Sequence, residues 1–197
     1  MLEKLPVILD GDPGHDDAIA WMLANSSSLL DIRAVTSVCG NQTIEKTTYN
    51  ALRVCTLIGL RCPVGKGRPA PLFSAPMNAP SVHGATGLDG PALPEPVMPP
   101  DGLRAVELMA KVLRESESPV CIVPTGPLTN VAALLLAHPE LKPKIARISL
   151  MGGGIAHGLL QGCVRLLRFG QFEDLGIGVG RAADGGRPRA AHDTALF

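Results

Sequence analysis

The sequence predicts an α/β protein, a three-layer and mainly parallel sheet built from Rossmann-like βαβ units. Short apolar runs typical of buried strands alternate with segments of helical periodicity. Hydrophobic residues make up 46% of the 197 residues, which is enough for a sizeable core. We expect residues 1–158 to form this core, incomplete at its C-terminal end. Residues 159–197 are expected to be an atypical tail, because their Gly-, Arg- and Ala-rich composition does not continue the alternation.

The first strand and helix are predicted from the N-terminal segment. Residues 6–9 are a continuous apolar run that ends at Asp10, which indicates a buried strand. Pro13-Gly14 predicts a turn. Acidic residues then open a helix expected over residues 17–24, where the positive end of the helix dipole favours them. Residues 31–38 alternate well enough to be the second strand.

The middle of the chain predicts two helices separated by a long connection. Thr43 is suited to cap a helix that we expect to run to residue 60. A short strand is expected at residues 63–64. The Pro- and Gly-rich stretch 65–102 is too long for an ordinary connection, and loops of this length are usually functional or disordered. Residues 104–115 have apolar side chains at helical spacing and predict the next helix.

The remaining elements continue the alternation. We expect a strand at residues 120–123, a helix at 128–137 and a strand at 145–151. Ligands of parallel sheets bind beyond the carboxyl ends of the strands. Four segments that directly follow expected strands therefore mark one candidate site: DGDPGHDD, CGN, PTGP and MGGG.

Composition excludes several classes of function. The formal net charge is zero, whereas a nucleic-acid or membrane-surface binder needs a basic excess. The five cysteines are odd in number and scattered, which fits buried thiols in a reducing compartment better than disulfides or a zinc site. There is no apolar run long enough to span a membrane and no signal-like N-terminus. We therefore expect a cytoplasmic protein with no nucleic-acid or membrane partner.

The segment ILDGDPGHDD concentrates negative charge behind the first strand. Asp10, Asp12, Asp16 and Asp17 place four carboxylates within eight residues. Like charges a few ångströms apart repel by roughly 1 to 4 kcal/mol per pair. Oxygen-only ligands select hard cations such as Ca²⁺ or Mg²⁺, so the cluster predicts a bound divalent cation.

Several interpretations of this cluster compete. An EF-hand loop is disfavoured because Gly14, His15 and Trp21 occupy positions where that loop needs a ligand, a glycine and a glutamate. A phosphatase of the haloacid dehalogenase type would use the first aspartate as nucleophile, but would leave Asp16-Asp17 unexplained. Helix capping explains only that pair. A site in which a cation activates water and an aspartate takes the proton gives every acid a role.

These residues resemble a known family. The pattern D-x-D-P-G-x-D-D after a first strand is similar to the signature of the inosine–uridine nucleoside hydrolases. The agreement continues in order along residues 5–157, and residues 88–96 look most like the bacterial pyrimidine-preferring ribonucleoside hydrolases. The matching segments are Gly40-Asn41-Gln42-Thr43, His83-Gly84, Gly87-Leu88-Asp89-Gly90, Thr125-Gly126-Pro127-Leu128-Thr129-Asn130 and Met151-Gly152-Gly153.

The resemblance implies a salvage enzyme that hydrolyses the N-glycosidic bond of a ribonucleoside (uridine, cytidine or inosine) to ribose and a free base, with bound Ca²⁺. Asp12 and Asp17 would be metal ligands together with the backbone carbonyl of Thr125, and Asp10 would belong to the same ligand shell. Asp12 would also be the general base. Relatives are commonly homodimers or homotetramers, so the resemblance implies a homo-oligomer.

The remaining implied roles concern the substrate. Asp16 and Asn41 would hold the ribose hydroxyls, and Met151 would contact the sugar. His83 would act on the nucleobase side. The chemistry agrees, because breaking the bond between ribose and base builds positive charge on the sugar, which carboxylates stabilise.

The sequence departs from the family after Gly158. The resemblance predicts a later segment with Glu and Asn for the sugar and then a His-Asp pair. Here His157-Gly158 is followed by Leu159-Leu160-Gln161, and His192-Asp193 comes too early to be that pair. We expect a truncated or frame-shifted product that has little or no hydrolase activity. The alternative is a catalytically inactive fragment that acts at most as a nucleoside- or subunit-binding module.

Overall fold

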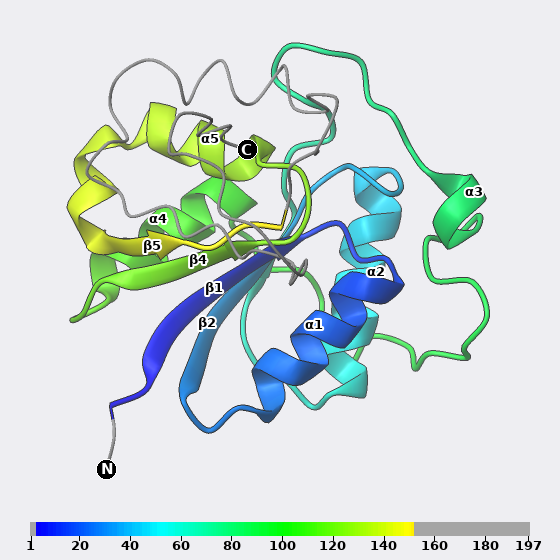
Figure 1. Cartoon of the computed structure of the whole chain (residues 1–197), viewed down its shortest axis with the longest axis horizontal. Helices are drawn as coiled ribbons and strands as arrows, with labels where there is room; N and C mark the ends of the chain where they lie inside the picture. The colour runs from blue at the N-terminus through cyan, green and yellow to red at the C-terminus, as the bar shows by residue number, and fades with distance from the viewer. Residues whose placement is uncertain (1–2, 152–197) are drawn as a thin grey trace, which may run out of the picture.

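The computed structural model describes residues 3–151, which form a five-stranded parallel sheet with helices on both faces (Figure 1). The strand order is β3-β2-β1-β4-β5. The strands are β1 (Leu5–Gly11), β2 (Leu30–Ser37), β3 (Val64–Gly65), β4 (Val120–Pro124) and β5 (Ile145–Ile148). The helices are α1 (His15–Ser26), α2 (Ile44–Leu57), α3 (Pro80–His83), α4 (Ala105–Glu115), α5 (Thr129–Ala137) and the 3₁₀ helix η1 (Pro139–Lys144).

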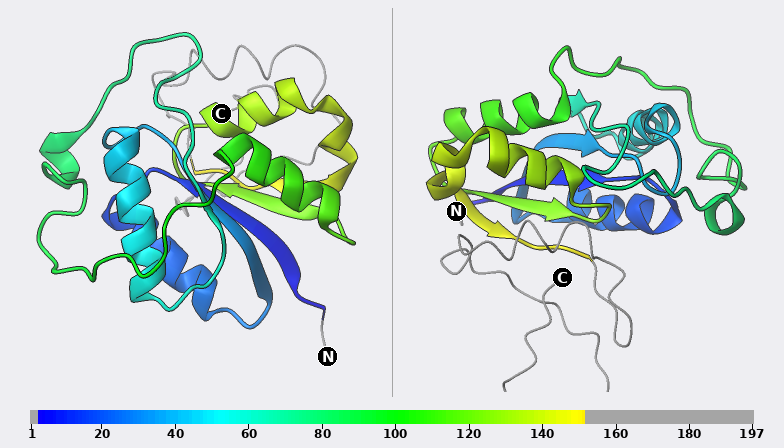
Figure 2. Two further views of the ribbon diagram at one scale, coloured as in Figure 1. Left: turned by 180° about the vertical axis from the view of Figure 1, so that it is seen from behind. Right: turned by 90° about the horizontal axis from the view of Figure 1, so that it is seen from above.

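The two faces of the sheet have separate cores because side chains alternate along each strand. Ile8 of β1 packs in the cluster formed with α4 and α5. Val7 and Leu9 point the other way, into the cluster formed with α1 and α2. Figure 2 shows α4 and α5 on one side of the sheet and α1 on the other. The predicted three-layer α/β class is confirmed for the described residues. Within residues 3–151 we find no helix that is both long and apolar enough to cross a membrane.

Most predicted elements are present, with shifted ends. The expected strand 145–151 ends at Ile148, although the backbone N–H groups of Ser149 and Met151 still donate to Ile122 and Pro124 of β4, at 2.9 and 3.0 Å. Thr43 is the N-cap residue of α2, but its side chain makes no capping hydrogen bond. The long connection contains the short helix α3, which lies well away from the sheet (Figure 1). The tail predicted at 159–197 lies outside the described residues.

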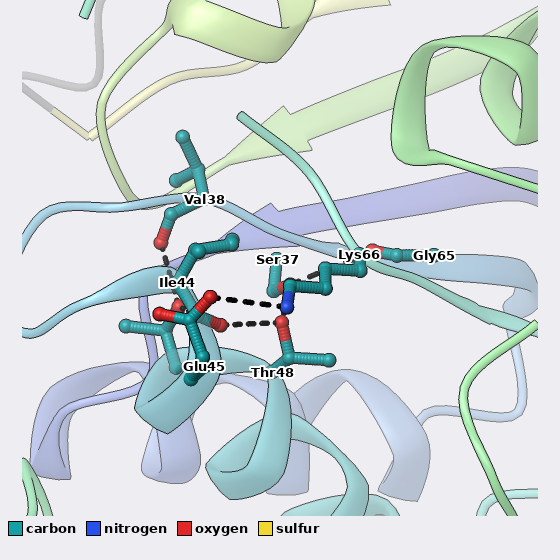
Figure 3. Close-up of polar contacts among 8 residues, drawn as sticks. Ser37, Val38, Ile44, Glu45, Thr48, Gly65 and Lys66 are labelled. Atoms are coloured by element: carbon teal, nitrogen blue, oxygen red, sulfur yellow. Dashed lines mark hydrogen bonds and ion pairs between the residues drawn. The ribbon is translucent and has the colours of Figure 1, made fainter. Parts of the chain in front are cut away.

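A buried polar network joins the start of α2 to the end of β2 (Figure 3). The Thr48 hydroxyl donates to the Ile44 carbonyl at 2.6 Å and lies 2.7 Å from the Ser37 hydroxyl. The hydroxyl of the preceding residue, Thr47, donates to the Val38 carbonyl at 2.9 Å. On the surface, Lys66 pairs with Glu45 at 3.1 Å. These contacts fix where the chain turns between β2 and α2, which is where Asn41 lies.

Candidate functional site

The candidate site lies at the carboxyl ends of β1, β2 and β4, the edge that the sequence predicted. Asp10 is in β1, and Asp12 follows that strand. The segment carrying Asn41 follows β2, and Thr125 follows β4. Because β1 pairs with both neighbours in parallel, these segments leave the sheet side by side.

Asp10 is completely buried on the face of the sheet covered by α5. Its Oδ1 accepts hydrogen bonds from the Thr36 hydroxyl at 2.6 Å and from the Asn130 side-chain amide at 2.8 Å. Its Oδ2 is buried and has no hydrogen-bond partner among the described residues. Burial raises the pKa of Asp10 to about 7, against the two hydrogen bonds that lower it. The carboxylate is therefore held in place while one oxygen remains unsatisfied.

Asp12 is buried against the segment that follows β2. Its Oδ2 accepts the backbone N–H of Asn41 at 2.6 Å, and the Asn41 side-chain amide donates back to the Asp12 carbonyl at 3.1 Å. Burial, followed by the charge of Asp17, raises the pKa of Asp12 to about 8. Asp12 and Asn41, assigned separately from the sequence, are thus one hydrogen-bonded unit.

Asp17 points back into the site from the first turn of α1. Its Oδ2 accepts the backbone N–H of Gly14, the N-cap residue, at 3.2 Å, so it also caps the helix. Its Oδ1 accepts a hydrogen bond from the Thr125 hydroxyl. Burial is the main cause that raises the pKa of Asp17. The Thr125 backbone N–H donates to the Asp10 carbonyl at 2.8 Å, which holds Thr125 beside β1.

Two glycines let neighbouring loops approach Asp12. A Cβ atom on Gly40 would lie 2.0 Å from Asp12 Oδ2, and one on Gly126 would lie 2.5 Å from Asp12 Oδ1. Real Cβ atoms do not come this close to another atom, so both positions require glycine in this arrangement. The glycines of the CGN and TGP segments therefore serve the close packing around the carboxylate.

His83 reaches the site from α3 and meets a histidine that was not among the sequence-predicted site residues. The His83 and His15 rings are stacked with centroids 5.7 Å apart, and their Nδ1 atoms are 3.5 Å apart. His15 Nε2 donates to the Asp89 carbonyl at 3.0 Å. A Cβ on Gly14 would lie 2.6 Å from His83 Nδ1 and 2.8 Å from the Asn41 side-chain amide, so both side chains border Gly14.

Asp16 and Met151 are less closely integrated. Asp16 is exposed in the first turn of α1. Met151 is brought beside the site by its backbone bond to Pro124, but 56% of the residue is exposed. The structure therefore groups Asp10, Asp12, Asp17, Asn41 and Thr125 closely, with His83 at the margin.

The buried oxygen atoms are donors of the type that a hard cation prefers. The fit to a cation is indicated by the unsatisfied Asp10 Oδ2 and by the raised pKa values of three neighbouring acids. The hydrogen bonds to these carboxylates come from neutral donors. No group of three His, Cys, Asp or Glu side chains in that part of the chain lies close enough to hold a metal. A cation here would need further donors, such as the backbone carbonyl of Thr125.

Sequence reasoning placed Asn130 in a segment that resembles the family but gave it no role, whereas in the structure it holds Asp10 in position. The Asn130 side-chain amide donates to Asp10 Oδ1 and to the Ser37 carbonyl, both at 2.8 Å, and its oxygen accepts the Arg68 N–H at 3.0 Å. It is fully buried in the first turn of α5. The available signal was a single asparagine in an otherwise apolar helix directly after a strand end.

The fold and the site define an α/β protein with an acidic, oxygen-lined site at the carboxyl edge of a parallel sheet. The sequence matches the profile of the inosine-uridine preferring nucleoside hydrolases over residues 7–168, and the chain belongs to this family. It is 59% identical over 155 residues to the pyrimidine-specific ribonucleoside hydrolase RihA of Escherichia coli O1:K1 / APEC. That similarity covers 78% of this chain and 50% of the relative.

Solved structures agree with this assignment. A purine-preferring ribonucleoside hydrolase from Gardnerella vaginalis superposes with a TM-score of 0.71 at 30% identity, covering 76% of this chain and 49% of that one. The plant nucleoside hydrolase PpNRh1 gives a TM-score of 0.70 at 34% identity, covering 76% and 48%. The chain thus spans about half the length of the relatives that it matches.

Proposed function

We propose that this site serves calcium-dependent hydrolysis of the N-glycosidic bond of pyrimidine ribonucleosides such as uridine, giving ribose and the free base. The observation that carries the proposal is the burial of Asp10, Asp12 and Asp17 together, with raised pKa values and with hydrogen bonds from neutral donors. The family membership supports the reaction class. The similarity to a pyrimidine-specific relative supports the choice of base.

Different residues of the site would bind the metal, the sugar and the base. Asp12, Asp17 and the Thr125 carbonyl would hold Ca²⁺, and Asp10 would support these ligands. When bound, the cation supplies positive charge that keeps the carboxylates ionised and makes nearby water more acidic. Asp12 accepts the proton of the attacking water, and the hydrogen bond from the Asn41 N–H keeps its carboxylate oriented.

Other residues of the site bind the ribose and the base of the substrate. Asn41 and Asp16 bind ribose hydroxyls, and Met151 contacts the sugar. His83, which borders Gly14 beside the Asn41 side chain, faces the departing base. The carboxylates stabilise the positive charge that develops on the ribose ring as the bond breaks.

The substitution Asp12→Asn tests the proposed function. It removes the base while keeping an oxygen for the Asn41 N–H. We expect Asp12→Asn to lower uridine hydrolysis by roughly 10²- to 10⁴-fold, the usual contribution of a general base. The measurement is uracil release with Ca²⁺ present, using long incubations because the departures after Gly158 predict slow turnover.

Asp31→Asn is the matched control, since Asp31 pairs with Arg33 at 3.0 Å at the opposite end of β2. It should leave the rate unchanged. Equal rates for the wild-type chain and Asp12→Asn would contradict the proposal.

A binding module without turnover is the second candidate. It is favoured by the finding that no three His, Cys, Asp or Glu side chains within residues 3–151 could hold a metal. Uridine binding by the wild-type chain with no uracil release would support this candidate against the hydrolase. The expected homo-oligomeric state and cytoplasmic location stay predictions.

A further inference from the structure

Gln42, which lies just before α2, and Lys46 and Asn50, in its first two turns, bind three consecutive carbonyls that follow His83. Lys46 and Asn50 lie on one face of the helix because they are four residues apart, and Gln42 continues the same spacing before the N-cap residue Thr43. We call these three residues the α2 row. The Gln42 amide donates to the Gly84 carbonyl at 2.9 Å, Lys46 to Ala85 at 2.5 Å, and Asn50 to Thr86 at 2.9 Å.

The same short loop is also held through its N–H groups. The Asp89 carboxylate accepts the backbone N–H of Ala85 at 2.8 Å and that of Thr86 at 2.9 Å. The loop after His83 is not part of the sheet, so these side chains replace the regular backbone pairing that would otherwise fix it. Its position therefore depends on the α2 row and on Asp89, together with the burial of Leu88 in the core and the His15 bond to the Asp89 carbonyl.

Asn50 connects this loop to the acidic segment. Besides the Thr86 carbonyl, its amide donates to the Pro13 carbonyl at 3.3 Å, and the residue is almost completely buried. The position of a Cβ on Gly87, which has φ +90°, is only 3.0 Å from the Asn50 amide nitrogen. One amide thus bridges the segment that carries Asp12 and the loop that follows His83.

The α2 row starts next to a residue with a proposed role in substrate binding. Asn41, which bonds to Asp12, directly precedes Gln42, and the buried network of Figure 3 anchors the first turns of α2 to β2. The helix is a rigid element, so it fixes the position of the His83 loop relative to Asn41 and Asp12.

We propose that Gln42, Lys46 and Asn50 are positioning residues that set the gap between the ribose side of the site and His83. This inference rests on the proposed function, because it gives His83 the base side of the substrate. The residues act through His83 and do not touch the substrate. A displacement of about 1 Å of such a group can cost roughly 100-fold in rate, so the α2 row influences how well the departing base is assisted.

The test compares Lys46→Met and Asn50→Leu with a matched control, Arg53→Met. Arg53 is on the same helix and also donates to loop carbonyls, those of Leu93 and Pro94 at 2.6 and 3.1 Å, but ten residues or more beyond His83. Lys46 is exposed, so Lys46→Met keeps the core intact even if Asn50→Leu fails to fold. Lys46→Arg, which restores a donor, is the rescue variant.

The first readout is amide hydrogen exchange of residues 84–87, which does not require turnover. We expect faster exchange there in Lys46→Met and Asn50→Leu, wild-type exchange in Arg53→Met and Lys46→Arg, and the same calcium affinity in every variant. Unchanged exchange in the first two variants would overturn the proposal. If a variant loses calcium affinity as well as protection of residues 84–87 from exchange, the proposal is also overturned, because the joint loss would indicate a general structural defect.

The second readout separates the base side from the sugar side. Uridine needs help for its departing base, whereas 4-nitrophenyl riboside has a leaving group that departs readily unaided. We expect roughly 10- to 100-fold lower kcat/KM for uridine in Lys46→Met, with 4-nitrophenyl riboside nearly unchanged. Equal losses for both substrates would overturn the positioning role. A wild-type chain that hydrolyses neither would contradict the proposed function alone, and the exchange measurement would still decide the role of the α2 row.

Discussion

Asp10, Asp12 and Asp17 are buried carboxyl groups whose environment opposes their charge. Burial is the largest cause of the raised pKa in all three, and repulsion from Asp17 adds to it for Asp10 and Asp12. Their hydrogen bonds come from neutral donors, namely Thr36, Asn130, Thr125 and the backbone N–H groups of Asn41 and Gly14. Neutral donors orient the carboxylates but do not cancel their charge, which is the condition that a cation would relieve.

The raised pKa values predict how the metal-free chain responds to pH. A carboxyl group with a higher pKa in the folded than in the unfolded state binds more protons when folded, so stability falls as pH rises. The fall should extend from near pH 3.8, the unfolded value, to about 7 for Asp10 and about 8 for Asp12. We expect urea unfolding in EDTA to give a lower free energy of unfolding at pH 8 than at pH 5.

Asp10→Asn is the control for this pH profile. The amide keeps an oxygen for Thr36 and Asn130 but cannot ionise, so the decline between pH 5 and pH 8 should become shallower. Each unit of pKa shift corresponds to about 1.4 kcal/mol, which makes the difference measurable. A metal-free wild-type chain that gains stability over this range would contradict the assignment of these acids as buried groups whose hydrogen bonds come from neutral donors.

Among the helices and strands, α2 fixes the positions of more segments around the site than its sequence indicates. Its first turns are fixed to the end of β2 by Thr47 and Thr48. From the same turns, Lys46 and Asn50 hold the loop after His83. The periodicity of the sequence predicted a helix after Thr43, but not that its polar side chains bind a distant loop. Those partners are more than 30 residues away along the chain and depend on the path of the long connection.

Thr48→Val tests the anchoring of α2. Valine keeps the shape of threonine but removes the hydroxyl that contacts Ser37, leaving the buried Ser37 hydroxyl without its near partner. We expect a loss of about 1 to 3 kcal/mol in the free energy of unfolding. Thr56→Val provides the comparison, because Thr56 makes a similar bond to Leu52 at 2.8 Å on a half-buried turn. The account of this network fails if both variants lose the same small amount.

For the described part of the molecule, the fold class followed from the sequence because each strand and helix has its own local pattern. Asp12, Asp17, Asn41 and Thr125 were also located correctly at one edge, since parallel strands bring their carboxyl ends together. The Asn130 bond to Asp10 and the His15–His83 contact were not predicted. These contacts join residues that are 120 and 68 positions apart in the sequence, and a local sequence pattern does not predict which distant side chains meet. The short helices α3 and η1 were missed because their prolines are typical of loops.

The central claim for the whole molecule is that Asp12 and Asp17, together with the Thr125 carbonyl, hold a divalent cation and that Asp10 supports these ligands. The most direct measurement is the thermal midpoint of the wild-type chain with EDTA and with Ca²⁺, at pH 5 and at pH 8. A ligand that binds only the folded state raises the midpoint, and proton competition weakens binding at low pH. We predict a clear rise with Ca²⁺ at pH 8 and a much smaller one at pH 5. A midpoint that Ca²⁺ leaves unchanged at pH 8 would contradict the claim.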